Sequence, residues 1–153
     1  MIAQSPIELA TASDAAQIAR MSRDLIEHGL GWSWGQARVA RCIRDPATNV
    51  IVTRSGGDVA AFGIMKYRDD EAHLVLLAVR AEARRRGTGG AIVRWLESSA
   101  LTAGIGVVYL EARRCNGGAR AFYRRLGYEE IRVLHGHYDG HEDGIRLAKD
   151  LWR

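Results

Sequence analysis

The chain has 153 residues, 47% of them hydrophobic and 26% charged, a composition typical of ordinary soluble proteins. That length suits one hydrophobic core, so we expect a single domain over residues 1–153. The formal net charge is +4, and much of the excess lies in two arginine clusters, at 84–86 and 113–125, rather than along one helical face. This distribution argues against a long nucleic-acid-binding track and favours a local ligand that carries phosphate.

Other features exclude further classes of protein. Two cysteines, Cys42 and Cys115, are too few for a disulfide framework. The first residues lack the pattern of a signal peptide, and no apolar run approaches the ~18 residues that a membrane span needs. We therefore expect a cytoplasmic protein that binds neither nucleic acid nor membrane. The sequence predicts no particular oligomeric state.

Strands and short helices are expected along the first half of the chain. A short edge strand is predicted around residues 7–9, and a helix begins near Asp14 and ends at Gly29. A second, short helix ends at Asp45-Pro46, because proline cannot continue it. Three strands follow, at 49–54, 58–67 and 72–79. A hairpin turn at Ser55-Gly56-Gly57 joins the first two.

The second half alternates helices with strands. A helix that ends at Gly104 is followed by a strand at 106–112 and a helix at 117–126. The chain closes with strands near 128–135 and 144–149. A hairpin-rich half followed by a β–α–β–α–β half predicts an α/β fold, with a mixed sheet of about seven strands and helices on both faces.

The most informative segment follows the strand at 72–79. Arg84-Arg85-Arg86 precede Gly87-Thr88-Gly89, where a turn opens a helix. Backbone N–H groups at such a turn, the helix dipole and the arginines would together attract a pyrophosphate. The chain lacks the Gly-x4-Gly-Lys-Ser/Thr of a P-loop, and a dinucleotide fingerprint fails at Ile92, where its third glycine should be. A glycine turn with solvated arginines is the remaining alternative.

A second segment makes a family resemblance specific. Residues 110–128 read Leu-Glu-Ala-Arg-Arg-Cys-Asn-Gly-Gly-Ala-Arg-Ala-Phe-Tyr-Arg-Arg-Leu-Gly-Tyr. Together with Arg84, Gly87 and Gly89, which match the pattern Arg/Gln-x-x-Gly-x-Gly/Ala, they resemble the GCN5-related N-acetyltransferase (GNAT) superfamily. Within it they are similar to RimI-type enzymes, which acetylate the N-terminal alanine of a ribosomal protein. The resemblance covers residues 72–128 and is weak before residue 58.

The resemblance implies a GNAT-like fold with acetyl-CoA as the cosubstrate. The parallel strands at 72–79 and 106–112 would separate, and the pantetheine arm would lie between them. Backbone amides from Arg85 to Gly90 would hold the pyrophosphate, and Asn116 would bond the pantetheine. The cofactor-binding residues that it implies are Leu77, Ala78, Val79, Arg84, Arg85, Arg86, Gly87, Thr88, Gly89, Gly90, Asn116 and Tyr123.

The resemblance also implies direct acetyl transfer to a primary amine, with Glu111 as general base and Tyr123 as the acid for the leaving thiolate. An α-amino group has a reference pKa of about 7.7–8.0, so a carboxylate acting through one water can remove its remaining proton. Two other interpretations stay open: Glu111 as an ion-pair partner of a nearby arginine, and Tyr123 as a core aromatic. His73 is an alternative base, although strand alternation also allows a core histidine.

The acceptor that the resemblance favours is a protein N-terminal α-amine. A free amino acid, a polyamine or another small amine is the alternative, and a non-catalytic acyl-CoA sensor is a third. Where the RimI-type pattern has two tyrosines, this chain has His137 and Tyr138, and the loop after them is shorter. Acceptor-binding residues are therefore expected at His137 and Tyr138. Trp32 and Trp34, in a glycine-rich stretch before the second helix, are further candidates for the acceptor wall, and capping of the core is the equal alternative for both.

The histidines near the end of the chain superficially suggest a metal site. His135, His137 and His141 lie close together in sequence, but their spacing fits no common zinc pattern. No metal is expected. Cys115, next to Asn116, is expected to be a small filling residue, because direct transfer needs no cysteine nucleophile.

Overall fold

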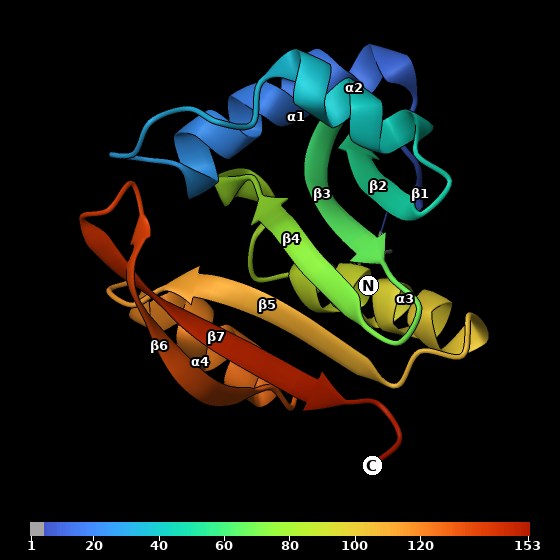
Figure 1. Ribbon diagram of the computed structural model, residues 1–153. Coiled ribbons are helices and arrows are strands. Elements are labelled where there is room, and N and C mark those ends of the chain that lie inside the picture. Colours follow the sequence, from blue (N-terminus) through green and yellow to red (C-terminus); the bar gives the residue numbers. More distant parts are fainter. Residues whose placement is uncertain (1–4) are drawn as a thin grey trace.

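The computed structural model describes residues 5–153 and is organised around one seven-stranded sheet (Figure 1). The strand order is β1-β2-β3-β4-β5-β7-β6, and neighbours are antiparallel except for β4 and β5. The predicted mixed sheet is confirmed. The strands are β1 (Glu8–Leu9), β2 (Thr48–Ser55), β3 (Asp58–Tyr67), β4 (Ala72–Val79), β5 (Val107–Arg113), β6 (Glu129–Tyr138) and β7 (Glu142–Asp150).

Helices cover both faces of the sheet, as predicted. Two of them, α1 and α2, pack on β2 and β3 from one side, and α3 and α4 lie on the other side (Figure 1). Within residues 5–153, none of the helices has the length and apolar character needed to cross a membrane. The helical elements are η1 (Ala12–Asp14), α1 (Ala15–Met21), η2 (Ser22–Ile26), α2 (Gln36–Arg44), η3 (Ala81–Ala83), α3 (Thr88–Thr102) and α4 (Gly117–Arg125).

Two hydrophobic clusters, one on each face of the sheet, hold these layers together. Strand β3 contributes to both, because Phe62 and Ile64 pack with α1 and α2 while Met65 packs with α3. At Gly63 helix α3 approaches so closely that an added Cβ would lie 2.7 Å from Cγ2 of Ile92. This close approach fixes the position of α3, and therefore of its first turn, relative to the sheet.

The first helix differs from the sequence prediction, which extended it to Gly29. α1 ends at Met21, and the chain continues as η2, a wider π-helical turn. The N–H of Glu27 donates to the carbonyl of Ser22 at 2.7 Å, and the Glu27 carboxylate accepts from Ser22 Oγ at 2.9 Å. The side-chain bond supports the wider turn, which hydrophobic spacing does not predict. Such turns often occur at functional sites.

The closing hairpin also differs from the prediction. β6 extends to Tyr138 and β7 begins at Glu142, so most of the expected loop at 136–143 is strand. The reversal takes only three residues because Asp139 (φ 55°) and Gly140 (φ 73°) both adopt the left-handed conformation. His137 and Tyr138 therefore lie on a strand that reaches beyond the end of β5.

The parallel strands β4 and β5 separate, as predicted. They pair only at three positions: Ala72 with Val108, His73 with Tyr109, and Leu74 with Leu110. Beyond Leu74, β4 runs on to Val79 along β3 alone, with an irregularity in that pairing near Val75. The edge of β4 that faces β5 is thus left without a strand partner, and an opening forms between the two strands.

Candidate active site

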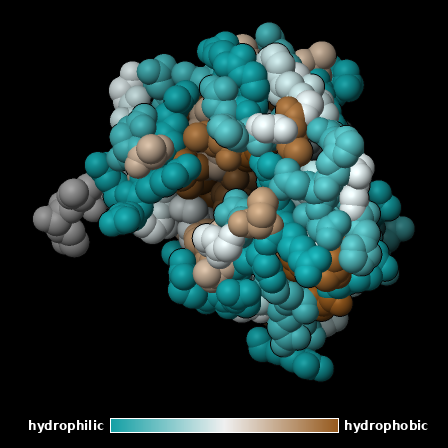
Figure 2. Space-filling model, turned by 90° about the vertical axis from the view of Figure 1, so that its left-hand side faces the viewer, coloured by the Kyte–Doolittle hydropathy of each residue, from teal (hydrophilic) through white to brown (hydrophobic). Residues whose placement is uncertain are grey.

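Two cavities meet at this opening. The loop cavity, about 780 Å³, lies between β4, β5, the 27–34 loop and the β6–β7 hairpin. The helix cavity, about 700 Å³, lies between the end of β4, the start of α3 and α4. Figure 2 looks onto the side where the strands separate and shows a hollow with a hydrophobic floor inside a hydrophilic rim. The residues that line both cavities are Leu25, Leu77, Asn116, Ala119 and Tyr123.

The helix cavity contains backbone groups that are free to bind a ligand. Gly87 begins α3 with a left-handed φ of 75°, and no side chain caps the first turn, so its N–H groups are open to a ligand. A Cβ on Gly89 would lie 3.2 Å from Cζ of Phe122, within the wall of the cavity. The free edge of β4 offers further backbone groups to an extended ligand. This is a surface suited to a long molecule with a phosphate group.

Eleven of the twelve residues expected to bind the cofactor line the helix cavity, and Arg86 does not. The backbone at Arg85 (φ 64°) and Gly87 is left-handed, so the chain turns on both sides of Arg86. Arg84 Nε donates to the carbonyl of Val79 at 3.0 Å, which closes the loop between β4 and α3. The Asn116 carbonyl oxygen caps α4 by accepting from the Ala119 N–H at 3.0 Å, leaving its amide nitrogen available.

Glu111 lies on the β5 side of the loop cavity and contacts His73 and Arg146. Its Oε1 is 2.6 Å from His73 Nε2, and its Oε2 accepts from Arg146 Nε at 3.1 Å. The Glu111 side chain is only 11% exposed, which by itself would raise its pKa. The hydrogen bond from His73 and the charges of His73 and Arg146 outweigh burial, so the pKa of Glu111 lies below its usual value.

His73 differs from the interpretation as a core histidine. Along β4 the odd-numbered residues are half-buried and the even-numbered ones are buried, so His73 faces the cavity with 39% of its side chain exposed. The structure thus brings both candidate bases into direct contact. Arg146 was missed by sequence reasoning: it is opposite Glu111 in the antiparallel register of β5 and β7, which sequence alone does not reveal.

Tyr123 lies on α4 where the two cavities join. Its ring packs edge-on against Phe122 at 5.1 Å and Tyr128 at 5.9 Å between centroids, and the residue is 9% exposed. Burial raises the pKa of its hydroxyl. No other group in the described part of the chain hydrogen-bonds to that hydroxyl, so it is available to a ligand at the junction.

Side-chain contacts hold the walls of the loop cavity in place. Arg113 pairs with Glu142 of the hairpin and also donates from Nη1 to the His28 carbonyl at 2.6 Å. At the mouth of the loop cavity, where the 27–34 loop meets the β6–β7 hairpin, the N–H of Gly31 donates to Asp139 Oδ2 at 2.8 Å. Residues from β5, the 27–34 loop and the hairpin therefore form one connected wall.

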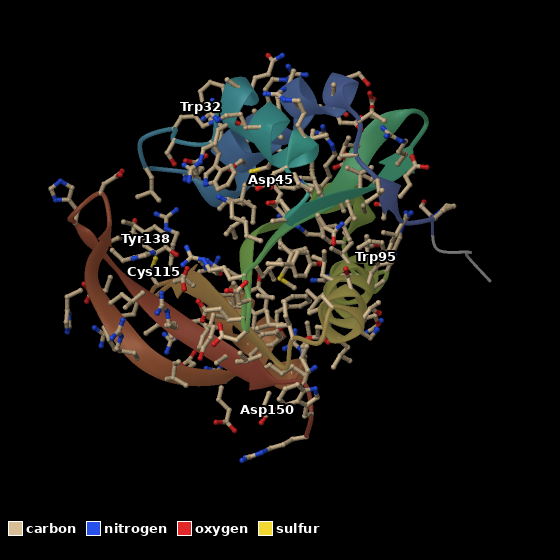
Figure 3. All side chains as sticks on the ribbon, turned by 45° about the vertical axis from the view of Figure 1, so that its right-hand side comes forward. Trp32, Asp45, Trp95, Cys115, Tyr138 and Asp150 are labelled. Atoms are coloured by element: carbon tan, nitrogen blue, oxygen red, sulfur yellow. The ribbon has the colours of Figure 1, made fainter. Side chains whose placement is uncertain are left out.

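Three of the four expected acceptor residues, Trp34, His137 and Tyr138, line the loop cavity. Trp32 does not line this cavity. Its Nε1 donates to the carbonyls of Ala19 and Trp34, and the residue is 48% exposed. In Figure 3, Tyr138 and Cys115 lie near each other beside the opening, whereas Trp32 lies on the outer side of the helices.

The charged residues around Tyr138 influence its ionisation. Burial, aided by the charge of Glu111, raises the pKa of the Tyr138 hydroxyl to about 12. Cys115 Sγ donates to Glu142 Oε1 at 3.1 Å. Over residues 5–153, no three His, Cys, Asp or Glu side chains are arranged to hold a metal ion.

Comparison with known proteins identifies the family. The model of the acetyltransferase (GNAT) family matches residues 17–128. The [ribosomal protein bS18]-alanine N-acetyltransferase of Escherichia coli K12 is 32% identical over 118 residues, which cover 75% of this chain and 79% of that protein.

Solved structures agree with the family match. The ribosomal-protein-S18-alanine N-acetyltransferase from Escherichia coli superimposes with a TM-score of 0.81 at 27% identity, covering 96% of this chain and 94% of that chain. Ard1 from Thermoplasma volcanium shares the fold with a TM-score of 0.84 at 23% identity, covering 97% and 99%. The chain therefore belongs to the GNAT family of acetyltransferases, acyltransferases that use acetyl-CoA.

Proposed function

We propose that this N-acetyltransferase acetylates the N-terminal α-amine of a protein, with Glu111 and His73 on the amine side and Tyr123 on the thiolate side. The observation that carries the proposal is the position of Tyr123, which lines both cavities where the loop cavity, with Glu111, meets the helix cavity. The similarity to an Escherichia coli enzyme that acetylates a ribosomal-protein alanine supports the choice of acceptor.

The helix cavity provides the groups that would hold the donor. The open N–H groups at the start of α3 would bind its pyrophosphate, and the free edge of β4 with the Asn116 amide would bind its extended arm. Acetyl-CoA, when bound, supplies an acetyl thioester. Because a side chain at position 89 would enter this wall, glycine lets the backbone approach the ligand.

The pair Glu111–His73 would take the proton of the acceptor amine. With its pKa below the usual value, the Glu111 carboxylate stays ionised at neutral pH. It can attract an ammonium group and accept its proton through a water. A second route runs through a neutral His73 imidazole, which would accept the amine proton on one ring nitrogen and pass the Nε2 proton to the carboxylate oxygen 2.6 Å away. Arg146 holds the opposite carboxylate oxygen and so fixes the direction in which the free lone pairs point.

Tyr123 would serve the other side of the reaction. The amine nitrogen forms a bond to the acetyl carbon, the carbon–sulfur bond breaks, and the electron pair of that bond goes to sulfur. Burial keeps the Tyr123 hydroxyl protonated, and it can donate first a hydrogen bond and then the proton to the departing thiolate.

Thiol release from acetyl-CoA by the purified protein tests the proposal. The panel contains peptides that start with alanine or serine, free amino acids, polyamines and other small amines. Turnover of the peptides, with little for alanine amide, is the expected result. Turnover of small amines alone would reject the protein acceptor, and acetyl-CoA binding without turnover of any amine would indicate a sensor.

A further inference from the structure

Arg38 is a charged residue of the loop cavity that the mechanism above does not use. It lies on α2, with its guanidinium carbon 3.8 Å from the centroid of the Trp34 ring. Its one hydrogen bond is long, from Nη1 to the Ser33 carbonyl at 3.4 Å. Among residues 5–153, no carboxylate lies within 4.0 Å of this guanidinium.

The other charged side chains that line the loop cavity have partners in the protein. Glu111 and Arg113 are each held by the ion pairs described above. Glu27 is buried and accepts four hydrogen bonds from residues 22–34. Asp139 accepts from Gly31 on the hairpin side of the mouth. Arg38, on the α2 side, is thus a cation of this cavity without an anionic partner.

The stacking on Trp34 prepares Arg38 to bind a ligand. Trp34 is only 8% exposed, so its ring is a fixed surface, and Lys66 Nζ adds a second positive charge 5.9 Å from the same ring. A guanidinium stacked by one face still presents its N–H edges, and these match the two oxygens of a carboxylate. The α2 wall of the loop cavity therefore favours a carboxylate.

We propose that Arg38 binds a carboxylate of the acceptor, so that the preferred acceptors are protein N-termini with Asp or Glu close behind the acetylated residue. This inference rests on the proposed function, because it assigns a contact to the acceptor of the same site. A cavity of about 780 Å³ has room for more than the reacting amine, which suits a peptide. The carboxylate of a free amino acid offers the same chemistry from a smaller molecule.

The test compares kcat/KM for alanine-starting peptides that differ at one position, with Glu, Gln or Arg placed second, third or fourth. The wild type is expected to prefer a Glu peptide over its Gln counterpart by about tenfold or more, as for a charge-assisted hydrogen bond. Arg38→Gln should lower kcat/KM on the Glu peptide by about 10- to 100-fold and remove the preference. Arg38→Glu should reverse it in favour of the Arg peptide.

Arg41→Gln is the matched control, because Arg41 lies on the same helix, outside both cavities, and loses the same charge. It should keep the wild-type preference. Arg38→Lys, which keeps the charge but not the planar fork, replaces Arg38→Gln if that variant does not fold. Equal rates on Glu and Gln peptides at every position, or equal effects of Arg38→Gln and Arg41→Gln, would overturn the inference while leaving the proposed function intact.

Small acceptors separate the two sources of a carboxylate. Free alanine and alanine amide differ only in that group. Turnover of free alanine but not of any peptide, lost in Arg38→Gln, would overturn the peptide assignment here and the protein acceptor above. No turnover of any amine would reject the proposed function itself.

Discussion

The helix cavity and the loop cavity are built in different ways. The helix cavity offers unpaired backbone groups from neighbouring segments: the free edge of β4, the uncapped first turn of α3 and glycines 87 and 89. The loop cavity is formed by side chains from distant segments, which Arg113, Glu142 and Asp139 connect by hydrogen bonds and ion pairs.

Because of this difference, we expect the two cavities to recognise different ligands. In the proposed function, backbone groups would recognise the phosphate and amide groups that every acetyl-CoA molecule carries, so the helix cavity could remain the same while acceptors differ. Side chains can be exchanged one at a time without changing the fold, so we expect acceptor choice to reside in the loop cavity. Changes at the junction, in the helix cavity and in the loop cavity should therefore have distinct kinetic signatures.

The largest effect is expected at the junction. Tyr123→Phe removes the hydroxyl that faces both cavities but keeps the ring contacts with Phe122 and Tyr128. We expect kcat to fall by about 10²–10⁴-fold for every acceptor, with a small change in the KM for acetyl-CoA. Steady-state thiol release measures both constants.

Tyr67→Phe is the control for this prediction. The Tyr67 hydroxyl is buried near Ser99, forms no well-aligned hydrogen bond within the described residues and lies outside both cavities. Its removal should leave kcat unchanged and should not lower the melting temperature. If Tyr123→Phe behaved like Tyr67→Phe, the role of Tyr123 as acid would be wrong.

A change in the helix cavity should affect the donor and not the acceptor. In Gly89→Val the new side chain would meet Phe122 and Val79 and enter the cavity wall. Overpacking typically costs about 1–3 kcal/mol, and where the bound ligand must displace the new side chain the same cost weakens binding, so we expect the KM for acetyl-CoA to rise by about 5- to 150-fold. The KM for the acceptor should stay near its wild-type value. Gly117→Val, where an added Cβ meets nothing within 4 Å, should change neither constant.

A change at Glu111, the proposed base, should lower the free energy of unfolding. The Glu111 pKa is below its usual value of 4.5 in the folded protein, so the unfolded chain binds this proton more readily. The contribution of the ionised Glu111 to the free energy of unfolding is therefore complete above about pH 4.5. It is lost as the pH falls through the pKa that Glu111 has in the folded protein. Glu111→Gln should reduce the free energy of unfolding at pH 7 by about 1–3 kcal/mol.

Urea unfolding at several pH values measures this effect. The gap between wild type and Glu111→Gln should narrow below pH 4.5, because the wild type then loses the same ion pairs. Glu82→Gln, outside both cavities, should show no such narrowing. A gap that stayed constant down to pH 3 would contradict the assigned pKa direction.

The sequence predicted the helix cavity better than the loop cavity for a physical reason. Backbone sites are encoded locally: Gly87 and Gly89 directly follow a strand and open a helix, so a short motif contains the geometry. The exception, Arg86, shows that a motif does not predict which side chains reach the wall.

The loop cavity depends on register and on long-range contacts, which a motif does not contain. Arg146 meets Glu111 because β7 pairs with β5 in one particular register, and Arg38 lines the cavity because α2 packs over β2. Trp32 and Trp34 are two residues apart in sequence, yet only Trp34 lines the cavity. Composition and spacing do not distinguish the two.

The smallest effect is expected at the mouth of the loop cavity. Asp139→Gly removes the bond from the Gly31 N–H but keeps a residue that tolerates the left-handed backbone at this position. Because the bond is exposed, we expect the acceptor KM to rise only about two- to fivefold, with kcat and the acetyl-CoA KM unchanged. Asp139→Asn keeps an oxygen acceptor and tolerates the same backbone, so it should resemble the wild type. A larger change in the acetyl-CoA KM than in the acceptor KM would show that the two cavities are not independent. It would contradict the assignment of donor binding to the helix cavity and of acceptor binding to the loop cavity.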